Sequence, residues 1–94
     1  MACELLLELS NVLHAKDYAT KTIRNYVQEM RLVFGYYNDL DPRDITQKDL
    51  INYINFIKTT HGVGCEKCRM VVASCGFFYK NVLRSDIVFT SEPP

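Results

Sequence analysis

Apolar side chains recur at alternating intervals of four and three residues over 23–37, and this period constrains the fold more than any other feature of the sequence. Such spacing places the side chains on one stripe of an α-helix, because the helix turns once in about 3.6 residues. We therefore expect a long helix from Thr20 to about Tyr37, in which Thr20 is the N-cap that pairs with a free backbone N–H. The stripe consists of Ile23, Val27, Met30, Phe34 and Tyr37.

Three further segments show the same helical period, and they predict helices over 3–14, 46–59 and 65–83. The helix over 46–59 should begin with a capping box, because Asp49 follows Thr46 by three residues. The apolar stripes of these helices predict the rest of the core. They are Leu5, Leu6, Leu9, Val12 and Leu13 in the first helix; Leu50, Ile51, Ile54 and Ile57 in the third; and Cys68, Val71, Val72, Cys75, Phe78, Tyr79 and Val82 in the fourth.

Short interruptions separate these segments, and no strand-like alternation competes with the helical period. Pro42 breaks the chain after the second helix, and the Gly-Val-Gly run at 62–64 ends the third. A chain of 94 residues that is 48% apolar can bury the core of one domain without a metal or a disulfide. We therefore expect an all-α fold, a compact bundle of four helices over 1–84. Residues 85–94, which end in Ser-Glu-Pro-Pro, are predicted to begin a linker.

The charge of the chain is balanced overall but not locally. Eleven basic and eleven acidic residues give a net charge of zero, which argues against a strong electrostatic attraction to nucleic acid. Residues 14–38, however, carry a net charge of +2, and residues 64–84 carry +3. The second and fourth helices are therefore the basic parts of the molecule.

The side of the second helix opposite its apolar stripe is rich in hydrogen-bond donors. It holds Lys21, Arg24, Asn25 and Gln28. Lysine and arginine bind phosphates, while asparagine and glutamine pair with base edges, so this face suits a DNA groove. An ordinary solvated face is the alternative interpretation.

The fourth helix repeats the arrangement, with Arg69, Lys80 and Arg84 opposite its apolar stripe and Ala73 and Gly76 between them. Small residues on an exposed face allow a partner to approach the helix backbone closely. The alternative is that Gly76 makes room for a neighbouring helix. Two donor-rich helices together could contact adjacent grooves of one duplex.

The cysteines and histidines suggest a metal site only weakly. His61, Cys65 and Cys68 have part of a zinc-ligand spacing, but a second close pair of ligands is missing. The Cys-x-x-Cys run at a helix start is also typical of thiol redox sites, although the strands of those folds are absent from the pattern. We therefore expect four free thiols and no metal or other cofactor.

The sequence has no apolar run long enough to span a bilayer, so no membrane partner is expected. Glu4 and Glu8 occupy the opening of the chain, where a signal peptide would carry positive charge. These observations favour a cytoplasmic protein.

Four runs of the sequence follow one another in the order and spacing of a known helical domain. They are Tyr18-Ala-Thr-Lys-Thr-Ile-Arg-Asn-Tyr26, Leu40-Asp-Pro-Arg-Asp-Ile-Thr-Gln-Lys-Asp-Leu50, Phe77-Phe-Tyr-Lys80 and Ser91-Glu-Pro93. They are similar to the motifs G-Y-S-x-x-T-I-x-x-Y, I-T-x-x-D-I, S-F-Y-R and S-N-P, respectively. The chain thus resembles the N-terminal core-binding (SAM-like) domain of a tyrosine recombinase, a phage-type integrase. It departs from that family at 64–69, where Gly-Cys-Glu-Lys-Cys-Arg replaces a helix start rich in serine and threonine.

The resemblance implies that the chain binds double-stranded DNA and forms one half of a clamp during DNA integration and recombination. Its partners would be the catalytic domain of the same parent chain and other recombinase protomers, in a bacterial or phage-encoded protein. Because the family's catalytic residues belong to the other domain, no enzymatic activity is expected. A helical protein-interaction module without DNA contact remains the alternative. The predicted DNA-binding residues are Thr20, Lys21, Thr22, Arg24, Asn25, Gln28, Lys67, Arg69, Lys80 and Arg84.

Overall fold

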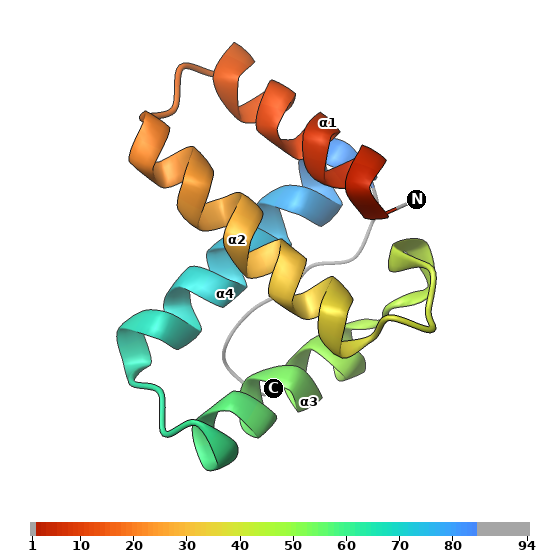
Figure 1. The fold of residues 1–94 in the computed structure, drawn as a ribbon, viewed down its shortest axis with the longest axis vertical. Coiled ribbons are helices and arrows are strands. Elements are labelled where there is room, and N and C mark those ends of the chain that lie inside the picture. The colour runs from red at the N-terminus through yellow and green to blue at the C-terminus, as the bar shows by residue number, and fades with distance from the viewer. Residues whose placement is uncertain (1, 85–94) are drawn as a thin grey trace.

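A computed structural model describes residues 2–84, and all the regular structure in this part of the chain is helical (Figure 1). Four α-helices account for most of it, as the sequence predicts. A 3-10 turn precedes the third α-helix, and a π-helical turn extends the fourth. The elements are α1 (Ala2–Ala15), α2 (Thr20–Tyr36), η1 (Pro42–Asp44), α3 (Gln47–Thr60), α4 (Cys65–Phe77) and η2 (Phe78–Val82).

Helix α2 is the centre of the molecule, as Figure 1 shows. It packs against α1 on one side and crosses α4 on the other, while α3 contacts both α2 and α4. The η2 turn at the end of α4 returns to α1. The core lies where these helices meet, and every α-helix contributes its apolar stripe to it.

The predicted stripes form most of this core, but not all of it. Six members of the predicted stripes are only half-buried and pack at its edge: Leu6, Val12, Val27, Tyr37, Ile51 and Val72. Other side chains that were not predicted are also buried, because α2 and α4 are covered on more than one side and because α3 and the connection before it add to the core. The additional buried residues are Glu29, Val33, Pro42, Ile45, Tyr53 and Ser74.

The start of α3 agrees with the predicted capping box, whereas the start of α2 corrects the predicted cap. Thr46 N–H donates to Asp49 Oδ2 at 3.0 Å, and Asp49 N–H donates to Thr46 Oγ1 at 3.2 Å. At the start of α2 the N-cap is Ala19, whose carbonyl accepts the N–H of Ile23 at 3.0 Å. Thr20 is therefore the first helical residue, and its hydroxyl does not cap the helix.

The turn between α1 and α2 places Asp17 in the left-handed region, with φ of 62°. Two backbone hydrogen bonds close the end of α1: Asp17 N–H to the carbonyl of His14 at 3.0 Å, and Tyr18 N–H to that of Leu13 at 3.1 Å. This is the Schellman arrangement, in which glycine is the favoured residue at the left-handed position.

Asp17→Gly should therefore stabilise the domain by about 0.5–1 kcal/mol, because glycine adopts positive φ without the steric penalty of a Cβ atom. Urea denaturation of the variant and the parent domain measures the difference. Asp17→Ala is the matched control, since alanine keeps the Cβ atom and loses the aspartate's tolerance of positive φ. An Asp17→Gly variant no more stable than Asp17→Ala would contradict this account of the turn.

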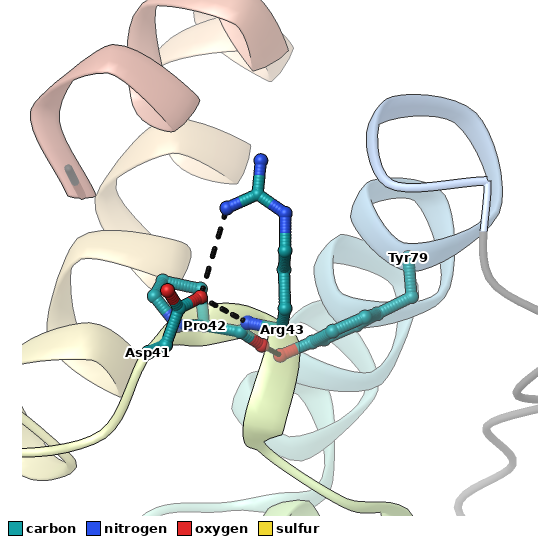
Figure 2. A network of polar contacts seen from close by, with 4 residues as sticks. All are labelled: Asp41, Pro42, Arg43 and Tyr79. Carbon is teal, nitrogen blue, oxygen red and sulfur yellow. Dashed lines mark hydrogen bonds and ion pairs between the residues drawn. The ribbon is translucent and has the colours of Figure 1, made fainter.

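The helical period predicts a regular fourth helix up to Leu83, but the α-helix ends at Phe77. From Phe78 to Val82 it widens into a π-helical turn, and Leu83 N–H donates to the carbonyl of Phe78 at 3.1 Å. The side chains of Phe78 and Tyr79 both remain in the core. The Tyr79 hydroxyl donates a buried hydrogen bond of 2.9 Å to the carbonyl of Pro42 in η1 (Figure 2). This bond fixes the end of α4 to the connection between α2 and α3.

Candidate nucleic-acid interface

The predicted donor-rich face of α2 lies on the surface. Lys21, Arg24 and Gln28 are exposed, and Asn25 is half-buried. Their spacing along the helix turns them away from the core stripe, as the sequence predicted. Among the neighbouring threonines of the predicted set, Thr20 is exposed and Thr22 is half-buried.

Part of this face lines a groove between α1 and α2 with a volume of about 460 Å³. Arg31, which was not predicted, joins the polar lining, and its Nη1 donates to Gln28 Oε1 at 3.3 Å. The signal for Arg31 was present in the sequence, because it follows Gln28 by three residues and Arg24 by seven, which are helical repeats. The full lining is Ser10, Ile23, Arg24, Asn25, Val27, Gln28 and Arg31.

The basic residues of the fourth helix form a separate group. Arg69 on α4, Lys80 in η2 and Arg84 just beyond η2 are all exposed, and none of them lines the groove beside α2. A Cβ atom added to Gly76 would meet nothing within 4 Å. Gly76 is therefore not required by the packing of a neighbouring helix, and its face of α4 is open.

Lys67 differs from the other predicted basic residues, because its ammonium forms an ion pair with the carboxylate of Glu29. Glu29 lies on α2 and is only 5% exposed, and its other oxygen, Oε1, is buried without a hydrogen-bond partner among the described residues. A glutamate is rarely buried, so the helical pattern gave no reason to expect one here. The charge of Lys67 is thus already balanced inside the fold.

A second groove, of about 400 Å³, lies between the end of α2, α3 and the start of α4. Its walls are aromatic and aliphatic apart from His61 and Lys67, and the ring of Tyr36 lies 4.7 Å from that of Phe56 and 5.3 Å from that of Tyr53. Burial, and then the charge of Glu29, raises the pKa of Tyr53 to about 12, so its phenol stays protonated. The lining residues are Leu32, Tyr36, Tyr53, Phe56, Ile57, His61, Val63 and Lys67.

The thiols and histidines do not assemble into a site within residues 2–84. No group of three His, Cys, Asp or Glu side chains in this part of the chain could hold a metal ion. Cys68 and Cys75 are buried, and Cys3 and Cys65 are exposed, each as a free thiol. Burial, followed by the charge of Glu29, raises the pKa of Cys75 to about 12, which leaves it unreactive.

No helix within residues 2–84 has both the length and the apolar character that a membrane crossing needs.

Comparison with known proteins agrees with this architecture. A family model described as the phage integrase N-terminal SAM-like domain matches residues 5–88, which include nearly all of α1 and the whole of α2, α3, α4 and η2. Comparison with curated protein sequences returns no match. The family describes the N-terminal domain of integrases rather than their catalytic domain. The resemblance noted in the sequence is thus confirmed over most of the chain, and the chain belongs to the family of phage integrase N-terminal SAM-like domains.

Proposed function

We propose that this domain binds double-stranded DNA through the outward face of α2, with the exposed basic residues of α4 and η2 as a second contact. The observation that carries the proposal is the grouping of Arg24, Asn25, Gln28 and Arg31 along one groove at the surface of α2. Arginine pairs with phosphate oxygens, and asparagine and glutamine amides pair with base edges in the major groove. Membership of an integrase family supports this use of the face.

The distribution of charge sets the expected strength of binding. The net charge of +2 over 14–38 and of +3 over 64–84 attracts the DNA backbone, whereas the neutral chain as a whole adds no long-range attraction. The isolated domain should therefore bind weakly and in a salt-sensitive manner. In the parent protein the catalytic domain and other recombinase protomers would supply the remaining contacts, so that the duplex is clamped for integration and recombination.

Strand cleavage is assigned to that other domain. The family to which the chain belongs describes the N-terminal domain of integrases and not their catalytic domain. We accordingly propose a DNA-binding role without catalysis, in the cytoplasm of a bacterial host and encoded by a phage or another mobile element.

Alanine substitutions across a salt series test the DNA interface. Arg24→Ala, Arg69→Ala and Lys80→Ala should each weaken binding to all duplexes and reduce the salt slope by about one unit, because each removes a phosphate contact. Asn25→Ala should weaken binding to the preferred duplex by about fivefold or more and relax the sequence preference, because it removes a base contact. The preferred duplex is selected from a random library with the parent domain. Circular dichroism provides the folding control.

The alternative function, a protein-interaction module, is favoured by the aromatic groove, where Leu32 and Tyr36 are each 42% exposed. An exposed apolar groove of this kind is typical of protein contacts. If all four alanine variants fold and bind DNA like the parent domain, the faces of α2 and α4 do not contact DNA, and this alternative replaces the proposal.

A further inference from the structure

We propose that the groove between α1 and α2 is a binding site for one backbone phosphate of the duplex, formed by Arg24, Arg31 and Ser10. This inference rests on the proposed DNA-binding function and deepens it, because it separates a phosphate contact from the base contacts on the same helix. Ser10 is thereby added to the interface, and Arg31 is given a defined contact.

The geometry of the groove suits a phosphate and its sugar. Arg24 and Arg31 are about two helical turns apart, on the same side of α2, and both line the groove. A volume of about 460 Å³ accommodates a phosphate together with part of the neighbouring deoxyribose. The apolar side chains of Ile23 and Val27 also line it and offer contact to the sugar carbons.

The electrostatics of the groove favour an anion. None of the seven lining residues carries a carboxylate. The ion pairs found within residues 2–84 involve Arg43 and Lys67, so neither arginine of the groove is neutralised there. Within the described part of the chain, the side chain of Arg31 donates only to the neutral amide of Gln28, which leaves its charge uncompensated. Two uncompensated guanidinium groups on one concave surface form a site that phosphate oxygens fit well.

Ser10 makes the groove a two-helix site. It lies on α1, is half-buried and lines the groove that the arginines line from α2, and its side chain is a neutral hydroxyl donor. Basic residues on a single helix can contact any phosphate that lies near them. A groove between two helices holds the bound phosphate in one position, because side chains contact it from both sides. We therefore expect the site to select one particular phosphate of the bound duplex.

The test combines Arg31→Met with a set of duplexes in which a single backbone phosphate is replaced by a neutral methylphosphonate. On the unmodified preferred duplex, Arg31→Met should weaken binding about tenfold, because a charge-assisted hydrogen bond is lost. Ser10→Ala should weaken it about threefold, as for a neutral hydrogen bond. One duplex of the set carries its methylphosphonate at the phosphate that the groove binds. On that duplex, the losses of affinity caused by Arg31→Met and Ser10→Ala should largely disappear, because the phosphate charge that these side chains contact is already absent. Arg69→Met, on α4, is the matched control and should keep its full loss on that same duplex.

The outcomes separate this site from the general function. If Arg24→Ala and Asn25→Ala weaken binding, but no single methylphosphonate removes the Arg31→Met loss, the phosphate site is wrong and the DNA-binding function stands. If the folded parent domain binds no duplex, both proposals are wrong. Inorganic phosphate tests whether the ligand is a free anion. Phosphate could compete with DNA more strongly than chloride does at equal ionic strength, and Arg31→Met could abolish this competition. That result would overturn the assignment to a backbone phosphate.

Discussion

Replacing Tyr79 by phenylalanine should lower the free energy of unfolding by about 1–3 kcal/mol, although the change removes a single oxygen atom. That oxygen donates the 2.9 Å hydrogen bond to the carbonyl of Pro42, and the tyrosine side chain is only 1% exposed (Figure 2). The Pro42 carbonyl also accepts the N–H of Ile45, but at 3.4 Å, so the change removes the shorter of its two hydrogen bonds between two buried residues. Because a buried acceptor that loses its better donor is left poorly satisfied, the loss exceeds that of an ordinary surface hydrogen bond.

Tyr37→Phe is the matched control for this prediction. The Tyr37 hydroxyl also donates to a backbone carbonyl, that of Asp49, at 2.8 Å, but Tyr37 is half-buried and water can take the place of the hydroxyl. Its replacement should cost about 0.5–1.5 kcal/mol. Urea denaturation of both variants gives the comparison. Equal losses in the two variants would show that the burial of the Tyr79 bond adds nothing to its strength.

The Lys67→Met variant should lower the free energy of unfolding by about 2–3 kcal/mol, since it leaves the carboxylate of Glu29 buried without its cation. Removing one partner of a fully buried pair costs about 3–5 kcal/mol, and the estimate is reduced here because water reaches Lys67. Its side chain is 38% exposed, whereas that of Glu29 is 6% exposed. Methionine keeps the length and apolar stem of the lysine, so the variant tests the charge rather than the packing.

A double substitution separates the ion pair from the rest of the core. Glu29→Leu together with Lys67→Met removes both charges, and its stability should return to within about 1 kcal/mol of the parent domain, as expected when apolar side chains replace a buried pair. Lys48→Met on α3 is the surface control and should change stability by less than about 0.5 kcal/mol. A double variant as unstable as Lys67→Met alone would indicate that the loss comes from packing and not from an uncompensated charge.

Sequence periodicity predicted the helices of this fold well, because each helix buries an apolar stripe whose spacing follows the helical turn. The capping box at Thr46 was predicted correctly for a similar reason, since its hydrogen bonds join residues only three positions apart. The π-helical turn at Phe78 could not be predicted in this way. It coincides with the hydrogen bond from Tyr79 of η2 to Pro42, which lies 37 positions away, and the period of a single helix contains no information about a contact at that distance.

The candidate interface shows the same division between local and distant determinants. Arg24, Asn25 and Gln28 were identified because residues on one helix share a face by spacing alone. The contribution of Ser10 depends on how α1 packs beside α2, which no pattern within a single helix contains. The pairing of Lys67 with Glu29 likewise joins α4 to α2. Whether these side chains contact DNA is a prediction that the binding experiments must decide.

The return of η2 to α1 has a consequence for the order in which the domain can fold during synthesis. Phe78, Tyr79 and Val82 are among the buried residues of the core, yet they belong to the last turn of the described chain. A nascent chain that ends before Phe78 exposes the apolar face of α1 that η2 covers. Closing the core brings together residues at opposite ends of the domain, which is a slow step because a long loop must be ordered first. The domain should therefore reach its stable form only after η2 has left the ribosome, and until then the part of α1 that η2 covers is exposed to other apolar surfaces in the cell.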